Sequence, residues 1–326
     1  MTLRLGLYVP TWAASGGLPP TWSEMRSLSR DAEAAGVDTL WVADELGFWE
    51  CWTILTAVAA ATSTVELGPF VANTRYRDPG VFAMMVRALD EVSGGRLVVA
   101  MGAGVGPNDP RWATFGWENA RHISRLAEAV EVVARLLRDG TATFDGEFFR
   151  LAVPDIGPVG PRPNGPPIWV AAGKPRTMEI AARWAQAVNF TPWLTSGDQV
   201  RLLAAELREA SERVGRESPP TMTGLALVAP SHDGRLDRDR PGAIAGTPAE
   251  VADRLVELHE AGIDHLTCFV SDGSTDVFPR LSAATLASFQ PILDAVHAAT
   301  VARPGSRASP TAPRPNPSRS ATPRVR

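Results

Sequence analysis

Short apolar runs alternate with longer amphipathic segments through most of this 326-residue chain. Most of eight such runs are nearly free of polar residues, as is typical of strands that are buried on both faces. The eight runs are Arg4–Val9, Thr39–Val42, Val65–Val71, Leu97–Met101, Ile168–Ala171, Ala187–Phe190, Gly224–Val228 and His265–Val270. Eight strand–helix units in about 300 residues favour a closed (β/α)8 TIM barrel of the α/β class over an open sheet.

The segments between these runs have helical periodicity. Apolar residues recur at spacings of three and four within Arg121–Asp139, which predicts a helix with one buried stripe. Another helix is predicted to begin at Thr247-Pro248, an N-cap residue followed by proline, and to end before Gly262. Two stretches interrupt the rhythm: an insertion after the fourth helix, Phe144–Pro167, and the polar Ser231–Pro241.

The C-terminal residues differ in composition from the rest of the chain. Residues 303–326 contain six arginines, six prolines, no acid and no large aromatic residue. Such a segment buries too little apolar surface to fold, which predicts a barrel over residues 1–302 and a disordered Pro/Arg-rich tail. Without the six arginines of the tail, 26 of the 32 cations face 36 acids, so no basic nucleic-acid face is expected.

Signals for a membrane, a disulfide or a metal are weak. No apolar run reaches the ~18 residues of a membrane span, and no cleavage site of a signal peptide follows Met1–Pro10. Cys51 and Cys268 lie far apart and outside any CxxC pair, and the five histidines lack the spacing of metal ligands. The sequence therefore predicts a soluble cytoplasmic enzyme that acts on a small molecule without a metal.

The single lysine of the chain, Lys174, follows the Ile168–Ala171 run. Pro175 and Arg176 come next and are suited to the first turn of a helix. Free backbone N–H groups at a helix start, beside Lys and Arg, bind anions well. The segment thus predicts a phosphate-binding loop, and a plain surface cation is the alternative.

In a (β/α)8 barrel, function belongs to the C-terminal ends of the strands and the loops beyond them. The second strand is followed by Asp44 and Glu45, so two adjacent carboxylates are expected at the barrel mouth. Trp12, Trp49 and Trp193 lie in or near the same loops and are candidates for the substrate pocket. Indoles at a mouth suit a flat ring system, although large aromatics also serve as core or cap.

Five stretches of the chain follow the order of motifs in one enzyme family. They are DTLWVADEL (Asp38–Leu46), VELGPFVANTRYRDPG (Val65–Gly80), SGGRLVVAMGAG (Ser93–Gly104), PPIWVAAGKPRTMEIAARWAQAVN (Pro166–Asn189) and GTPAEVADRLVELHEAGIDHL (Gly246–Leu266). Through them, about residues 3 to 296 resemble the bacterial-luciferase-like superfamily of flavin- or deazaflavin-F420-dependent oxidoreductases. The resemblance implies a luciferase-like (β/α)8 barrel.

The resemblance also implies roles for individual positions. Phe70–Val71 matches a non-proline cis peptide behind the deazaflavin ring, and the Gly173-Lys174 loop matches the site of the cofactor phosphate. Asp44 matches a residue near the ring or its hydroxylated chain, and Asn108 matches an amide on the cofactor side. The cofactor-binding residues expected on this basis are Asp44, Phe70, Val71, Asn73, Gly102, Asn108, Gly173, Lys174, Arg176 and Thr177.

Two positions depart from the family pattern. Many relatives have a catalytic histidine where this chain has Glu45, and Val105 replaces the glutamate of members that oxidise sugar phosphates. Oxidation of glucose 6-phosphate is therefore not expected. Glu45 becomes the candidate acid–base residue, with Asp44 beside it, if burial and the charge of Asp44 raise the pKa of Glu45 toward neutrality. A role in loop structure is the alternative for Glu45.

Three functions agree with these features. The first is hydride transfer between F420 and a small organic substrate, which Asn73-Thr74 and the compact chain favour. The second is an FMNH2-dependent monooxygenase that uses O2, with a separate reductase that supplies the reduced cofactor. The third is a non-catalytic flavin-binding homologue, against which the intact phosphate loop argues. A homodimer is compatible with all three functions.

Overall fold

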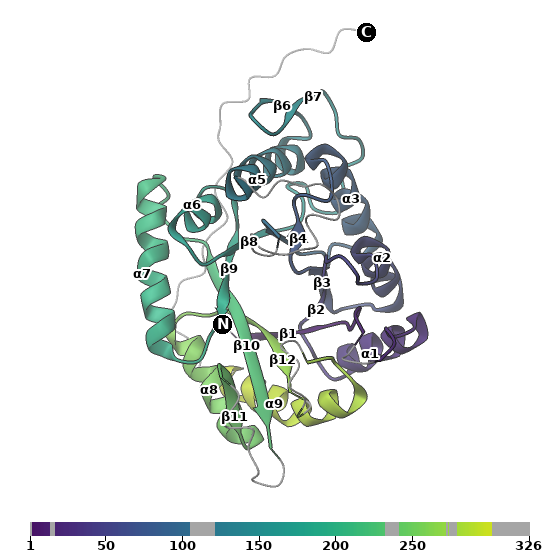
Figure 1. The fold of residues 1–326 in the computed structure, drawn as a ribbon, viewed down its shortest axis with the longest axis vertical. Coiled ribbons are helices and arrows are strands. Elements are labelled where there is room, and N and C mark those ends of the chain that lie inside the picture. The colour runs from purple at the N-terminus through teal and green to yellow at the C-terminus, as the bar shows by residue number, and fades with distance from the viewer. Residues whose placement is uncertain are drawn as a thin grey trace.

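The computed structural model describes residues 2–13, 17–104, 121–231, 241–271, 273 and 279–301. Parallel strands form a barrel surrounded by helices (Figure 1). The barrel strands are β1 (Arg4–Tyr8), β2 (Thr39–Val42), β3 (Glu66–Pro69), β4 (Ala72–Asn73), β5 (Val99–Gly102), β8 (Ile168–Ala172), β9 (Ala187–Trp193), β10 (Thr221–Pro230) and β12 (His265–Val270). Each of the eight predicted runs overlaps a strand, although several strands extend beyond the predicted bounds, and the predicted barrel is confirmed.

The third predicted strand consists of two short strands rather than one. The run Val65–Val71 was expected to be continuous, but β3 ends at Pro69 and pairs with β2, whereas β4 pairs with β5. The peptide bond between Phe70 and Val71 is cis, and it lies where the chain passes from one pairing to the other. Below this break, Leu67 of β3 and Leu97 form a single parallel bridge that closes the barrel.

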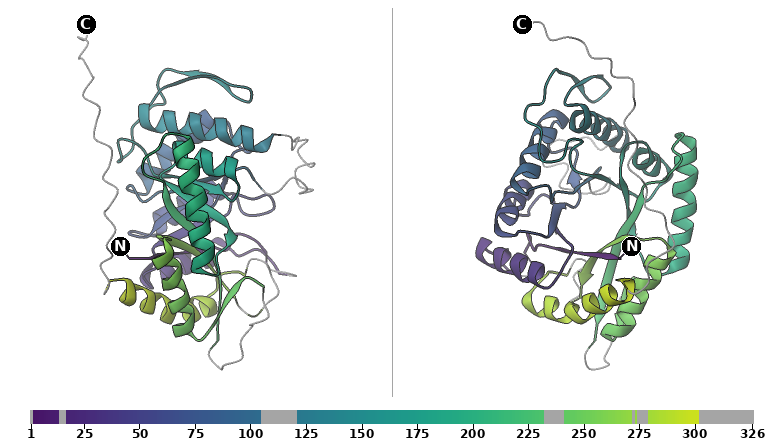
Figure 2. Two further views of the ribbon diagram at one scale, coloured as in Figure 1. Left: turned by 90° about the vertical axis from the view of Figure 1, so that its left-hand side faces the viewer. Right: turned by 180° about the vertical axis from the view of Figure 1, so that it is seen from behind.

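Eight helices of the described residues lie outside the barrel (Figures 1 and 2). They are α1 (Trp22–Ala34), α2 (Cys51–Ala61), α3 (Pro79–Val92), α5 (His122–Asp139), α6 (Pro175–Trp184), α7 (Gly197–Arg213), α8 (Pro248–Ala261) and α9 (Ala283–Val301). Helix α8 begins as predicted, because the Thr247 side chain accepts a hydrogen bond from the Glu250 amide, and Gly262 ends it. None of the described helices has the length and apolar character needed to cross a bilayer.

The predicted insertion contains a β-hairpin that the sequence pattern did not indicate. Strands β6 (Ala142–Asp145) and β7 (Arg150–Val153) pair in antiparallel fashion beyond α5. The Glu128 carboxylate of α5 accepts hydrogen bonds from the backbone amides of Glu147, Phe148 and Phe149 at 2.9–3.1 Å. The hairpin is thus fastened to α5 by its turn. A further unpredicted strand, β11 (Ala243–Gly246), pairs with β10.

Two sets of side chains fill the interior, because successive residues of a strand point to opposite faces. In β12, Leu266, Cys268 and Val270 pack among the residues between the barrel and the helices. Phe269 instead belongs to the cluster inside the barrel, which also contains Trp41, Phe70 and Trp169. A Cβ atom on Gly6 would lie 2.5 Å from Trp41 Nε1, so glycine is needed there to admit the indole.

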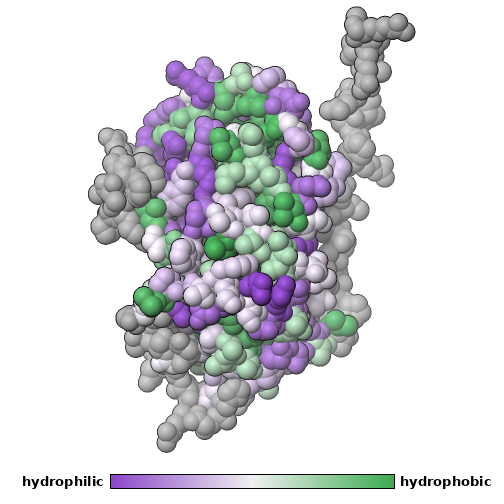
Figure 3. Space-filling view, turned by 90° about the vertical axis from the view of Figure 1, so that its right-hand side faces the viewer, coloured by the Kyte–Doolittle hydropathy of each residue, from purple (hydrophilic) through white to green (hydrophobic). Residues whose placement is uncertain are grey.

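The outer surface near α2 and α3 includes exposed apolar side chains. Helix α2 contains no charged residue, and Val81, Met84 and Val92 of α3 are exposed apolar side chains. Figure 3 shows apolar surface distributed over this side of the molecule. The polar stretch between Ser231 and Pro241 and the tail after residue 302 lie almost entirely outside the described residues.

Candidate active site

Asp44 lies directly beyond β2 and is almost fully buried at 7% exposure. Both of its oxygens contact Arg77, at 2.7 and 3.2 Å, and one oxygen also accepts the Asn73 backbone amide at 3.0 Å. Arg77 makes a second ion pair with Glu50 at 2.7 Å. These contacts tie the end of β2 to β4 and to the start of α2.

Burial and ion pairing have opposite effects on the pKa values of Asp44 and Arg77. Burial raises the pKa of Asp44 above its ordinary value, and Arg77 and the Asn73 amide, which donate to its carboxylate, offset only part of that rise. Burial lowers the pKa of Arg77, but the two carboxylates outweigh this and raise it. The bidentate contact with the Arg77 guanidinium favours the charged form of Asp44.

Glu45 is half-buried at the mouth and has defined hydrogen-bond partners. Its Oε1 atom accepts the Leu46 backbone amide at 3.1 Å and the Tyr76 hydroxyl at 3.3 Å. The Asn73 side chain hydrogen-bonds the same hydroxyl. Burial and the negative charge of Glu45 raise the pKa of Tyr76 to about 12, so the phenol is protonated at neutral pH.

Glycines at the end of β5 allow close contact with the break between β3 and β4. A Cβ atom on Gly102 would lie 2.4 Å from Cγ2 of Val71. Gly104 has a φ of 87°, and a Cβ atom there would lie 2.7 Å from Nδ2 of Asn73. Phe70 is buried, and its carbonyl accepts the Tyr8 hydroxyl at 2.9 Å. This side of the mouth is therefore tightly packed around Val71 and Asn73.

Aromatic rings form another side of the mouth. Trp12 stacks on Phe48 with ring centroids 5.2 Å apart, and Trp193 contacts Phe269 edge to face at 5.4 Å. Tyr8 lies between these groups, 4.5 Å from Phe269 and 6.3 Å from Trp12. Trp49 is 46% exposed and donates its indole N–H to the Pro20 carbonyl, so it lies farther out.

The loop predicted to bind phosphate has internal hydrogen bonds just before α6. The backbone amides of Gly173 and Lys174, just before the helix, both donate to the Thr177 hydroxyl, at 3.3 and 3.2 Å. Thr177 is the third residue of α6 and can therefore reach back to these amides. Lys174 is the N-cap residue of α6, and its side chain has no acceptor for the amides of the first turn. The first-turn amides after Pro175 can therefore donate to an anion.

Further cations lie near this loop. Lys174 and Arg176 are exposed, and Arg176 donates to the Ser124 hydroxyl of α5 at 3.0 Å. In α5, Arg125 lies over the Phe149 ring at 4.5 Å. Burial lowers the pKa of Arg75, and the neighbouring charge of Arg125 lowers it further, so these two guanidiniums are close together. We call Arg75, Arg125, Lys174 and Arg176 the cationic group.

Most predicted site residues lie around one end of the barrel, where the strands finish. Asn108 and Val105 lie outside the described residues. Sequence reasoning missed the roles of Arg75, Tyr76 and Arg77, although all three stand directly after the third strand in a quoted motif. Their position was a usable signal, because residues just beyond a barrel strand face the mouth.

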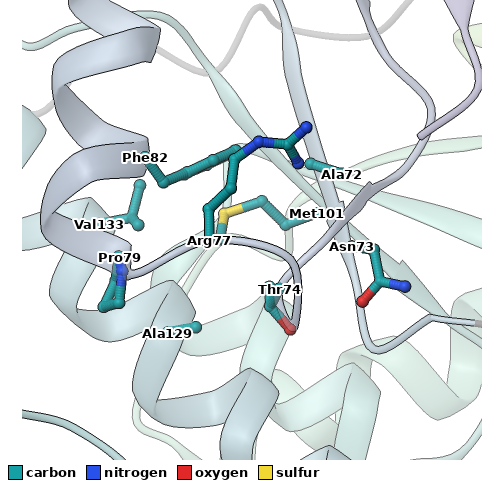
Figure 4. Close-up of a pocket in the computed structure, with 9 residues that line it drawn as sticks. All are labelled: Ala72, Asn73, Thr74, Arg77, Pro79, Phe82, Met101, Ala129 and Val133. Carbon is teal, nitrogen blue, oxygen red and sulfur yellow. The ribbon is translucent and has the colours of Figure 1, made fainter. Parts of the chain in front are cut away.

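A small hollow lies behind β4, between α3 and α5, rather than in the mouth (Figure 4). Apolar side chains from the two helices, including Phe82 and Val133, line it on one side, and Asn73 lies on the strand side. The hollow has room for about one water molecule. It is therefore too small for a flavin ring.

Comparisons with known proteins agree with this fold. The chain is 28% identical over 230 residues to 5,10-methylenetetrahydromethanopterin reductase of Archaeoglobus fulgidus, covering 68% of this chain and 67% of the relative. It is 28% identical over 254 residues to the F420-dependent glucose-6-phosphate dehydrogenase of Nakamurella multipartita, covering 74% and 72%. An F420-dependent secondary alcohol dehydrogenase, solved with an F420-acetone adduct, has the same fold at a TM-score of 0.74 and 18% identity. That superposition covers 91% of this chain and 99% of the other.

The family itself follows from a match over most of the chain. The family model of the luciferase-like monooxygenases matches residues 3–240. This range includes both carboxylates at the end of β2, the break between β3 and β4 and the loop before α6. The chain thus belongs to the luciferase-like monooxygenase family and is an oxidoreductase of that class.

Proposed function

We propose that the protein transfers hydride between coenzyme F420 and a small organic substrate. One observation carries the proposal: the tightly packed surface around Val71 and Asn73 lies at the same barrel end as the cationic group. A flat ring needs such a surface, and a phosphate-bearing chain needs cations and helix N-termini nearby. The F420-dependent relatives support the same cofactor.

The residues of the chain would divide the work as follows. Lys174, Arg176 and the first-turn amides of α6 would hold the cofactor phosphate. Arg75 and Arg125 would serve further anionic groups of the chain, because four cations exceed the needs of one phosphate. The bound deazaflavin ring supplies or accepts the hydride.

Asp44 and Glu45 would have different tasks. Asp44 is engaged by Arg77 and the Asn73 amide, so it would act indirectly by fixing Asn73. Glu45 is less buried and would accept or donate the proton that accompanies hydride transfer. Trp12 and Trp193 would keep water away from the reacting atoms.

An FMNH2-dependent monooxygenase is the second candidate, because the matching family is described as luciferase-like monooxygenases. In that case the aromatic side of the mouth would exclude water while reduced flavin meets O2. Activity measured in mixtures with a separate reductase would test for that partner. The molecular mass in solution would test for a homodimer.

Cofactor titration distinguishes the two candidates. Protein from a host that lacks F420 is titrated with F420 and with FMN while cofactor fluorescence is followed. We expect a Kd for F420 at least about tenfold lower than that for FMN. Tighter binding of FMN, together with substrate-dependent consumption of O2 in the presence of FMNH2, would favour the monooxygenase. Binding of either cofactor without turnover of any substrate would favour a non-catalytic protein.

A further inference from the structure

A chain of hydrogen bonds crosses the break between β3 and β4. It begins at the Asn73 side chain, passes through the Tyr76 hydroxyl and ends at Glu45 Oε1, 3.3 Å from that hydroxyl. Asn73 is 4% exposed, and its backbone amide is held by Asp44. Tyr76 belongs to the loop between β4 and α3, whereas Glu45 follows β2. The contact therefore fixes two separate loops against each other.

The charged surroundings of this chain are defined. Asp44 adds to the electrostatic effect of Glu45 on Tyr76. Arg77 and Glu50 lie behind Asp44, and the thiol of Cys51 lies near the same three groups. Arg77 is bound to the carboxylates of Asp44 and Glu50, whereas the donors to Glu45 include the Leu46 amide and the Tyr76 phenol.

We propose that Tyr76 is a positioning residue for Glu45, which sets both the orientation of the carboxylate and the pH at which it takes up a proton. This inference rests on the proposed function, since it assigns proton exchange to Glu45. A phenol that donates to a carboxylate stabilises the charged form of that carboxylate. Loss of the hydroxyl should therefore let Glu45 take up its proton at a higher pH.

Titration of the cofactor-free protein tests this directly. Glutamate side-chain carboxyls are labelled with ¹³C, and the resonance missing from Glu45→Gln identifies Glu45. In Tyr76→Phe the titration midpoint of that resonance should rise by roughly one pH unit. Tyr8→Phe is a matched control, because Tyr8 is the only other tyrosine and donates to the Phe70 carbonyl instead. That control should leave the midpoint unchanged.

A second measurement does not depend on how well Tyr76→Phe folds. Replacing both tyrosines by 3-fluorotyrosine keeps their shape but makes each phenol a stronger acid and a stronger donor. The Glu45 midpoint should then move in the opposite direction, to lower pH. An unchanged midpoint in both Tyr76→Phe and the fluorinated protein would overturn the inference.

Turnover completes the test and separates the inference from the proposed function. The midpoint of the pH–rate profile for single-turnover cofactor oxidation should rise in Tyr76→Phe by the same amount as the carboxyl midpoint. A shift of the carboxyl midpoint without a shift of the profile would overturn the role of Tyr76. By contrast, a wild-type rate in Glu45→Gln would reject the function proposed for Glu45. It would also reject a catalytic effect of Tyr76 through Glu45. The cofactor-free titration would still report on the hydrogen bond itself.

Discussion

The two ends of the barrel are held together by different interactions. Deeper in the barrel, toward the start of β8 and β12, the rings of Trp41, Trp169 and His265 pack at centroid distances of 5.1–5.7 Å and are buried. Where the strands finish, Asp44 and Glu45 take part in ion pairs and hydrogen bonds at a partly open mouth. Variants among the buried rings should therefore change stability, whereas variants at the mouth should change binding and rate.

The largest effect should come from the mouth. Glu45→Gln keeps the size of the side chain but cannot exchange a proton, so the single-turnover rate should fall by roughly 10²–10⁴-fold. The melting temperature and the Kd of the cofactor should change little. The measurement is reoxidation of reduced cofactor at saturating substrate between about pH 5 and pH 9. A rate within a few-fold of wild type, with the same pH profile, would show that Glu45 at the mouth does not exchange the proton.

A variant among the buried rings inside the barrel should reduce the stability of the protein instead. Trp41→Ala removes a fully buried indole and should lower the free energy of unfolding by roughly 3–5 kcal/mol in urea denaturation. Trp49→Ala is the control at the mouth, where the indole is half exposed, and should cost only about 1 kcal/mol. Equal losses in the two variants would contradict the division between the ends.

Acid should act through His265. Burial lowers the pKa of His265 to about 3, whereas the ordinary pKa of histidine is 6.5. Below pH 6.5 the unfolded chain therefore binds a proton that the folded chain does not, so stability falls as the pH drops toward 3. The loss should amount to a few kcal/mol by the lower limit. Denaturation at a series of pH values should show a smaller slope in His265→Leu, and an identical slope would reject the assignment.

A smaller effect on binding is expected at the phosphate loop. Lys174→Ala should raise the Kd of the cofactor about tenfold to hundredfold, which corresponds to roughly 1.5–3 kcal/mol for a charge-assisted contact. The difference from wild type should shrink at high salt, because salt screens exposed charges. Arg201→Ala, which removes an exposed cation of α7, is the control. An unchanged Kd for both F420 and FMN in Lys174→Ala would make Lys174 an ordinary surface cation.

The smallest effect concerns an ion pair where the strands begin. His297 of α9 contacts the Asp38 carboxylate at 3.1 Å, and this contact raises the pKa of His297. Burial raises the pKa of Asp38, but His297 and the Leu5 amide outweigh it and lower that pKa. The pair should contribute at most about 1 kcal/mol, because both groups are partly exposed.

The pH dependence of this pair has a definite sign. The contribution of His297 is complete below its unfolded pKa of 6.5 and is lost as the pH rises through its raised folded pKa. The contribution of Asp38 is present above 3.8 and is lost as the pH falls through its lowered pKa. His297→Gln should therefore reduce stability most between about pH 4 and pH 6.5. A loss that grows above pH 8 would contradict this.

The fold was largely predictable because its signals are local. Buried strands such as Thr39–Val42 and His265–Val270 agree with the structure at both ends, since continuous apolar runs and their flanking turns define them. The hairpin of β6 and β7 was missed because each strand has only four residues and lies at the edge of the core, where exposed residues alternate with buried or half-buried ones. Its turn is fixed by Glu128, which lies 19 to 21 residues earlier in the chain.

The site was less predictable because its interactions join distant segments. Asp44 was expected to lie near the cofactor, which stays a prediction; its contacts with Arg77 and Asn73 could not be predicted, because no local pattern links these residues to it. At the loop before α6, Thr177 accepts the amides of Gly173 and Lys174, and the phosphate site expected there stays a prediction. The tail from residue 303 lies outside the described residues, so a chain that ends at residue 302 and melts like the full-length protein stays a prediction.

The closure of the barrel has a consequence for hydrogen exchange. Strand β3 and the segment before β5 share one bridge, with backbone bonds from Leu67 to Arg96 and from Val98 to Leu67, whereas β10 and β12 pair over six residues. Local opening requires the fewest broken bonds where pairing is shortest. Amide protons at this closure should therefore exchange with solvent sooner than those between β10 and β12. Local opening of the barrel would therefore begin at Leu67, just before the break between β3 and β4 that the proposed cofactor site uses.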